Sequence, residues 1–342
     1  MKELLFELCT SNGVSGFESG MLDLVCEKVL PYADEVYFDR LGNLICFKRG
    51  NERPKKRIAF AAHADEVGMM VKHIEKDGTL LFDAIGILPS ALCAKRVFVG
   101  KNRIPGIIGS KPIHLLSKEQ RGKNVSAGDL YIDIGADSAE NALEHIKVGD
   151  AVSFYCDALS LSENIMKAKA IDDRAGCALL IELLKSELAY DAYFVFTRRE
   201  ELGTLGAVSA ANEIKPDICV VCEATTASDI CGTPDMKKVT KIGEGVAVPF
   251  MDGGTLYSRE LYDVCTRLAD EKGIKWQTKT MIAGGTDARS FQREGHGCAV
   301  LGVAVPTRYI HTGASVCDIR DVFAARELIF ALEKVLGGIS NV

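Results

Sequence analysis

The strongest constraint on the fold is an alternation of helix-like and strand-like segments that stops in the middle of the chain and then resumes. Near the start, apolar residues recur at helical spacing around 2–10 and 18–30, and strand-like runs lie around 35–48 and 57–63. The alternation returns in the second half, for example in the amphipathic segment 258–273, which ends at a glycine suited to a helix C-terminus. Such an alternation predicts an α/β fold with a mostly parallel sheet and helices on both faces.

The segment that interrupts this alternation is rich in short β-like runs. Between residues 68 and 165, runs such as MMVKHI, RVFVG and LYIDIG are separated by glycine-containing turns, which is typical of a small β-barrel or β-sandwich. A chain of 342 residues is also long for a single hydrophobic core. We therefore predict an α/β domain formed by residues 1–67 and 166–342, with a β-rich domain inserted at 68–165.

Charge and hydropathy argue against two classes of partner. The net charge is −6 and no run of Lys and Arg is long enough to form a basic face, so we expect no nucleic acid partner. No stretch approaches the roughly 18 consecutive apolar residues of a membrane span. The apolar residues of the opening MKELLFELC are interrupted by Glu3 and Glu7, unlike those of a signal peptide. We therefore expect a cytoplasmic protein with no membrane partner.

The twelve cysteines favour neither disulfides nor a thiolate metal site. The single C-x-x-C motif, Cys219 to Cys222, lies in the strand-like run DICVVCEA. Its odd spacing directs the two thiols to opposite faces of a strand, and no second pair is present to complete a zinc site. We expect reduced and mostly buried cysteines.

Ionisable residues stand at the ends of several predicted strands, where open α/β sheets bind their ligands. They are His63 and Asp65 after the strand at 57–62, Glu200 and Glu201 after YFVFTRR, Glu223 after DICVVC and His311 after AVPTRYI, with Asp172 and Asp173 at the start of the helix expected at 174–188. Taken singly, each has an ordinary explanation as a helix cap, a solvated loop residue or a structural histidine. Taken together, two histidines and several carboxylates indicate a metal site.

Imidazole and carboxylate ligands suit zinc, cobalt and manganese. Two histidines with three carboxylates are enough for two cations that share a bridging carboxylate, an arrangement that can polarise a carbonyl and activate a water. One of the adjacent Glu200 and Glu201 would then act as general base while the other binds metal. Asp65 would accept the second ring N–H of His63 and fix its orientation. The chemistry alone indicates a di-metal hydrolase acting on an acyl or peptide bond.

Five motifs in this order, AHADEVG, KAIDDRAG, RREELG, GGTDA and RYIH, resemble those of the tetrahedral aminopeptidases of metallopeptidase family 42, which include glutamyl and deblocking aminopeptidases. The resemblance covers essentially the whole chain. It implies an enzyme that removes N-terminal residues from short peptides with two divalent metal ions per subunit, zinc first and cobalt or manganese as alternatives. It also implies that the inserted domain forms dimers, which assemble into a tetrahedral dodecamer.

The resemblance further implies a role for each motif residue. His63 and Glu223 would bind one metal, Glu201 and His311 the other, Asp172 would bridge both, Glu200 would be the general base and acid, and Asp65 would steer His63. The family also has a cis peptide bond after the residue that matches Asp172. Glu223 is a departure, because the family usually has Asp at that position.

Other functions stay open at this point. Glu223 keeps a di-metal deacylase or carboxypeptidase-like amidohydrolase possible, whereas a glycosidase would leave the histidines unexplained. A non-catalytic metal-binding assembly would have no use for a free general base at Glu200. The substrate-binding residues are not assigned: an acidic preference would need Lys or Arg in the pocket, and for Arg289 and Arg308 a surface or structural role is favoured. For Asp287 in GGTDA, helix capping is favoured over substrate binding.

Overall fold

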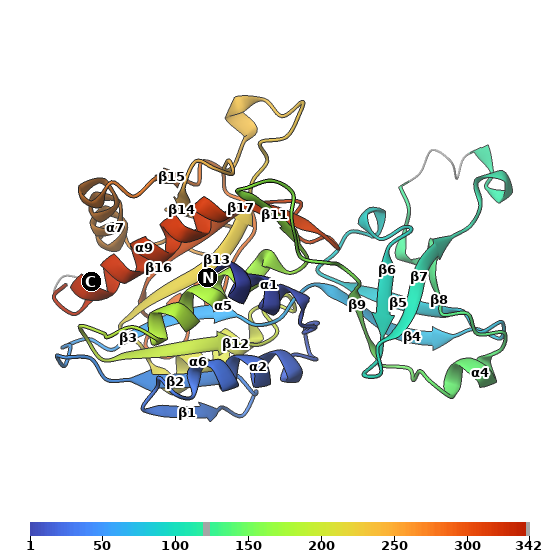
Figure 1. Ribbon diagram of the computed structural model, residues 1–342, viewed down its shortest axis with the longest axis horizontal. Coiled ribbons are helices and arrows are strands. Elements are labelled where there is room, and N and C mark those ends of the chain that lie inside the picture. Colours follow the sequence, from blue (N-terminus) through green and yellow to red (C-terminus); the bar gives the residue numbers. More distant parts are fainter. Residues whose placement is uncertain (119–123, 340–342) are drawn as a thin grey trace.

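The computed structural model describes residues 1–118 and 124–339, which form one large sheet with its helices and one closed barrel (Figure 1). The strands of the large sheet are β1 (Glu35–Phe38), β2 (Leu44–Lys48), β3 (Ile58–His63), β10 (Leu159–Ser160), β11 (Ile165–Ala168), β12 (Ala192–Thr197), β13 (Ile218–Thr226), β14 (Val246–Val248), β15 (Trp276–Thr278), β16 (Ala299–Arg308) and β17 (Ser315–Asp318). Their order is β1-β2-β12-β3-β13-β16-β17-β11-β10, and β14 joins β15 to β16 at the side of this path.

The centre of the large sheet is parallel. Strands β12, β3, β13 and β16 run in the same direction, and antiparallel strands extend the sheet on both flanks. The sequence IAFAAH of β3 is buried along its whole length, as expected for a parallel strand covered on both faces. The predicted α/β fold with a mostly parallel sheet is confirmed.

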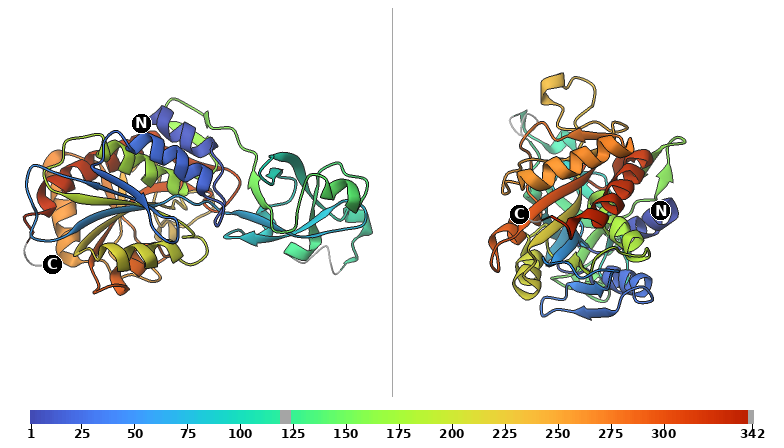
Figure 2. Two further views of the ribbon diagram at one scale, coloured as in Figure 1. Left: turned by 90° about the horizontal axis from the view of Figure 1, so that it is seen from below. Right: turned by 90° about the vertical axis from the view of Figure 1, so that its left-hand side faces the viewer.

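Helices cover both faces of the sheet (Figure 2). They are α1 (Lys2–Thr10), α2 (Ser19–Val29), α5 (Ile171–Leu184), α6 (Leu205–Ile214), α7 (Arg259–Lys272), α8 (Ala288–Arg293) and α9 (Ile319–Leu336). Helices α1, α2, α5, α7 and α9 share the larger hydrophobic core with one face, and α6 and α8 pack on the other. None of the helices in the described part of the chain is long and apolar enough to cross a membrane.

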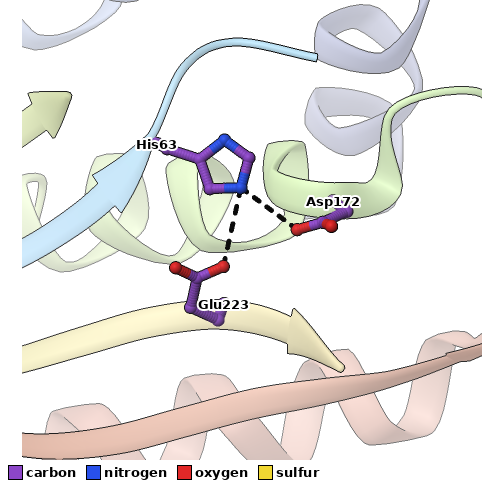
Figure 3. A group of neighbouring side chains, drawn as sticks. All are labelled: His63, Asp172 and Glu223. Atoms are coloured by element: carbon purple, nitrogen blue, oxygen red, sulfur yellow. Dashed lines mark hydrogen bonds and ion pairs between the residues drawn. The ribbon is translucent and has the colours of Figure 1, made fainter. Parts of the chain in front are cut away.

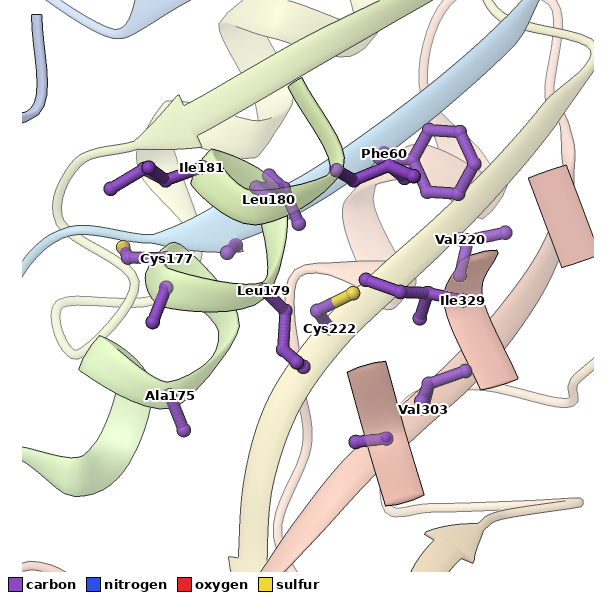
Figure 4. Close-up of a cluster of buried hydrophobic side chains, with 14 of the residues drawn as sticks. Phe60, Ala175, Cys177, Leu179, Leu180, Ile181, Val220, Cys222, Val303 and Ile329 are labelled. Atoms are coloured by element: carbon purple, nitrogen blue, oxygen red, sulfur yellow. The ribbon is translucent and has the colours of Figure 1, made fainter. Parts of the chain in front are cut away.

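The larger core is built by α5 and α9 against the central strands. Leu179 of α5 and Ile329 of α9 lie over Val220 of β13 (Figure 4). Cys222 belongs to this same core, whereas Cys219 is buried in the core on the opposite face. The predicted opposite orientation of these two thiols is therefore confirmed.

The inserted barrel is closed and has its own hydrophobic core. Its strands are β4 (Gly68–Ile74), β5 (Leu80–Ile85), β6 (Arg96–Val99), β7 (Ile104–Ser110), β8 (Leu130–Asp133) and β9 (Ala151–Phe154), with the short helix α4 (Ala139–Leu143) beside them. The chain enters the barrel directly after β3 and returns to the large sheet at β10. The predicted small β-barrel is thus confirmed, and the division of the chain at residues 67 and 165 stays a prediction.

Candidate metal centre and active site

The carboxyl ends of the central parallel strands meet at one edge of the sheet, and the predicted site residues gather there. In the parallel register of the sheet, His63 at the end of β3 pairs with Thr197 at the end of β12. All of the predicted metal-binding and proton-transferring residues lie at this edge: His63 ends β3, Glu200 and Glu201 follow β12, Glu223 lies in the last part of β13, His311 follows β16 and Asp172 stands in the first turn of α5.

Two clusters of ligand atoms form around one shared aspartate. In the first cluster, His63 Nε2 lies 3.1 Å from Asp172 Oδ1 and 3.6 Å from Glu223 Oε2 (Figure 3). In the second, His311 Nε2 lies 3.4 Å from Asp172 Oδ2 and 3.7 Å from Glu201 Oε1. The ligand atoms of each cluster all lie within 4.8 Å of one another. Asp172 therefore presents one carboxylate oxygen to each cluster, which is the geometry of a bridging carboxylate.

At the start of α5, Asp172 belongs to both clusters of ligand atoms and Asp173 to neither. The peptide bond between these two residues is cis, as the family resemblance implied. Asp173 Oδ1 accepts a hydrogen bond of 2.7 Å from the N–H of Gly176, so this carboxylate caps the helix. A Cβ at Gly176 would lie 2.2 Å from Asp173 Oδ2, which explains the glycine. Of the two adjacent aspartates, Asp173 caps the helix and Asp172 belongs to both clusters.

Asp65 connects the first cluster to the two glutamates. Its carboxylate is fully buried and accepts hydrogen bonds from the backbone N–H of Glu200 at 3.0 Å and of Glu201 at 3.1 Å. Asp65 Oδ1 also lies 3.4 Å from His63 Nδ1. Although burial opposes it, the interaction with His63 and the two backbone N–H groups lower the pKa of Asp65. This carboxylate therefore holds the backbone of both glutamates and lies within ion-pair distance of the histidine ring.

The inserted barrel contributes a positioning contact that the sequence did not predict. The carbonyl of Gly86, just after β5, lies 3.0 Å from His311 Nδ1 and accepts from it when that nitrogen is protonated. This orients Nε2 of the same ring toward the second cluster. Gly86 has a φ of +70°, and a Cβ there would lie 2.7 Å from Glu201 Oε2. Its only sequence signal is the glycine that closes the run TLLFDAIG.

The electrostatics of the site are those of crowded, buried or half-buried carboxylates. Burial raises the pKa of Glu200 well above its ordinary value and that of Glu201 to about 7, and neighbouring carboxylates add to both shifts. The contact with Asp172 raises the pKa of His311 to about 9. Although burial opposes it, the two histidines lower the pKa of Asp172. So many buried acids at one point call for a compensating positive charge.

The residues present fit a pair of divalent cations. Both clusters offer only imidazole nitrogen and carboxylate oxygen, the donors that zinc, cobalt and manganese accept. Glu223 Oε1 is buried without a hydrogen-bond partner among the residues that the structure describes, as expected for an oxygen whose partner is a bound ion. Glu200 belongs to neither cluster.

The other residues considered from sequence have structural contacts. Asp287 precedes α8, but its side chain makes no capping hydrogen bond, and its carboxylate accepts from the hydroxyl of Thr197 instead. The capping expectation was therefore wrong, because a buried tertiary contact replaces the local one. Arg308 forms an ion pair of 2.6 Å with Asp229, which is the structural role favoured for it.

Comparisons with known proteins place the chain among aminopeptidases. A family model described as M42 glutamyl aminopeptidase matches residues 42–328. The chain is 34% identical to the lysyl aminopeptidase of Pyrococcus furiosus over 96% of each chain. A TET aminopeptidase structure from Thaumarchaeota archaeon SCGC AB-539-E09 is 35% identical and superposes with a TM-score of 0.93, covering 98% of this chain and 96% of that one.

A further solved structure is the TET1 peptidase of Pyrococcus horikoshii, which can assemble into a tetrahedron or a large octahedral shell. It is 31% identical, has a TM-score of 0.86, and is matched over 97% of this chain and 98% of its own. The family resemblance drawn from the five motifs is thereby confirmed, as is the expectation of an enzyme of the aminopeptidase class. This chain belongs to the family of M42 glutamyl aminopeptidases.

Proposed function

We propose that the protein is a two-metal aminopeptidase that removes N-terminal residues from short peptides. The observation that carries this proposal is the shared aspartate: Asp172 turns one oxygen to each of two ligand clusters. The half-buried Glu200 lies beside both clusters without belonging to either. Zinc is the cation that we expect first, and cobalt and manganese accept the same ligands.

We assign the ligands from the two clusters. His63 and Glu223 would hold one cation, Glu201 and His311 the other, and Asp172 both. When bound, such cations polarise a carbonyl and lower the pKa of a water. Asp65 keeps His63 and the backbone of both glutamates in place, so that the ligand set stays ordered when a substrate enters.

Glu200 would carry the proton. Its carboxylate would accept a proton from the attacking water and return it to the nitrogen of the leaving amine. Because burial raises its pKa, the protonated and ionised forms of Glu200 lie closer in energy than for an ordinary glutamate, which suits a group that is base and then acid. The surrounding carboxylates also attract the ammonium group of a free peptide N-terminus.

The barrel and the assembly are part of the proposal. We propose that the inserted domain at 68–165 forms dimers, with residues 1–67 and 166–342 as the catalytic domain, and that dimers build a tetrahedral dodecamer. The shells formed by the similar Pyrococcus horikoshii peptidase support this assembly. We also place the protein in the cytoplasm, since all twelve cysteines are free thiols, as in reducing compartments.

A comparison of free and blocked peptides tests the proposed function. Protein reconstituted with zinc, cobalt or manganese is given peptides with free N-termini and varied first residues, and the same peptides N-acetylated. Release of the first residue from the free set alone is expected. Cleavage of the acetylated set alone would instead indicate a deacylase, and cleavage of neither set would favour a non-catalytic assembly.

A further inference from the structure

The loop that carries Glu200 and Glu201 is held by side chains from three distant segments of the chain. The backbone N–H groups of residues 198 to 201 each donate to a buried side-chain oxygen: Arg198 to Asn43 Oδ1 at 2.9 Å, Arg199 to Glu18 Oε1 at 3.1 Å, and Glu200 and Glu201 to Asp65. Asp65 also faces a metal-binding histidine, whereas Glu18 and Asn43 belong to neither ligand cluster.

Glu18 makes the most extensive contacts with this loop. It directly precedes α2 and is fully buried. Its Oε1 accepts from the N–H of Gly16 at 2.6 Å as well as from Arg199, and its Oε2 accepts from the guanidinium group of Arg198 at 2.7 and 2.6 Å. A buried carboxylate is tolerated when it is paired and hydrogen-bonded, and this one is both. It joins the start of α2 to the loop across 181 positions of sequence.

The contact with Arg199 holds an unfavourable backbone conformation. Arg199 has a φ of +57°, which residues with a Cβ adopt only at a cost in free energy. It lies between the end of β12 and Glu200, and its own N–H is the group that Glu18 accepts. On the other side of the loop, the carbonyls of Arg198 and Arg199 accept from the N–H groups of Gly206 and Leu205 in the first turn of α6. The direction in which the chain reaches Glu200 therefore depends on Glu18.

We propose that Glu18 is a positioning residue for catalysis, which acts through Arg198 and Arg199 to hold Glu200 beside the two ligand clusters. The inference rests on the proposed function, in which Glu200 carries the proton and Glu201 binds a cation. Glu200 belongs to neither cluster, so no bound ion would fix its place and only the backbone that carries it does so. Loss of Glu18 should therefore slow the chemical step more than it weakens the binding of metal or substrate.

Steady-state kinetics of Glu18→Ala and Glu18→Gln on a free leucyl peptide test this role. We expect Glu18→Ala to lower kcat by about 10- to 100-fold, with KM changed by less than about threefold. Its metal content, measured by elemental analysis, should equal that of wild type. Glu18→Gln keeps an oxygen for the N–H of Arg199 but loses the ion pair with Arg198, so its kcat should lie between those of wild type and Glu18→Ala. If Glu18→Ala does not fold, wild-type kcat in Glu18→Gln would overturn the proposal.

Asp321→Asn is the matched control for a loss of stability alone. Asp321 is also buried, and its carboxylate accepts the N–H groups of Gly243 and Gly245 at 2.6 and 2.8 Å, outside the loop at 198–201. This variant should unfold at lower urea concentration than wild type but keep the wild-type kcat. An unchanged kcat in Glu18→Ala, or an equal loss of kcat in Asp321→Asn, would overturn the proposal.

Hydrogen exchange followed by mass spectrometry separates failure of this inference from failure of the proposed function. In Glu18→Ala, or in Glu18→Gln where the former does not fold, the amides of a peptide spanning 198–204 should exchange about 10-fold faster than in wild type. In Asp321→Asn they should exchange at the wild-type rate. If the wild-type protein cleaves no peptide, the proposed function fails, and the exchange rates still decide whether Glu18 holds the loop. Equal rates in the Glu18 variant and in wild type would overturn the inference.

Discussion

Replacing Asp65 by Asn should lower both the stability and the activity of the protein, because this buried carboxylate contacts three groups of the site. Each of its oxygens accepts one backbone N–H, from Glu200 at 3.0 Å and from Glu201 at 3.1 Å, and Oδ1 also faces His63 Nδ1 at 3.4 Å. Asparagine has nearly the same shape but keeps only one oxygen. Its amide group would place N–H donors against a backbone N–H that needs an acceptor.

The expected loss of stability follows from these contacts. One hydrogen bond to a charged group contributes about 1.5–3 kcal/mol, and leaving a buried N–H without an acceptor costs about 1–3 kcal/mol. The free energy of unfolding should therefore fall by roughly 2.5–6 kcal/mol in Asp65→Asn. Because the backbone of Glu200 is no longer fixed, kcat/KM should also fall, by about 10- to 100-fold.

Urea unfolding and peptide hydrolysis measure the two effects on the same protein. Asp83→Asn is the matched control, because that aspartate is exposed and forms an ion pair with Lys72 at the barrel surface; it should behave as wild type. Since the folded-state pKa of Asp65 is lowered, its contribution is present above about pH 4 and is lost as the pH falls through the lower folded value. Equal stability and activity of Asp65→Asn and wild type at neutral pH would refute the role given to this carboxylate.

Three other outcomes can be checked on the same preparations. Glu200→Gln should keep its bound metal, measured by elemental analysis, but lose about 10²- to 10⁴-fold in kcat; activity equal to wild type would remove Glu200 as the base. Gly86→Ala places a Cβ 2.7 Å from Glu201 Oε2, so calorimetry should show weaker binding of one of the two cations, and unchanged binding of both would exclude the contact. Metal uptake should release protons at neutral pH, because His311 has a pKa of about 9 and Glu201 of about 7 before metal binds. Affinity should thus rise with pH between about 6 and 9, and calorimetry in buffers of different ionisation enthalpy that finds no proton release would contradict these pKa values.

The parts of the site that are predictable from sequence are those fixed by the sheet. His63 and Glu223 end apolar runs that could only be buried strands, and a parallel sheet brings such ends to one edge. The barrel was likewise evident from its short strands and glycine turns. These features depend on local periodicity, which a single sequence displays directly.

The unpredicted parts depend on packing between distant segments. Gly86 contacts His311 across 225 positions of sequence, from a barrel whose placement against the sheet no periodicity specifies. Asp287 has the local signature of a helix cap, but Thr197 of β12 competes successfully for its carboxylate.

The central claim is that two cations, shared through Asp172, are needed for removal of an N-terminal residue. The most direct test removes metal with a chelator, adds zinc, cobalt or manganese in steps, and follows release of leucine from a free leucyl peptide. The account predicts no activity without metal and a plateau at two equivalents per subunit, with Asp172→Asn inactive throughout. A plateau at one equivalent, or full activity in the metal-free protein, would contradict it.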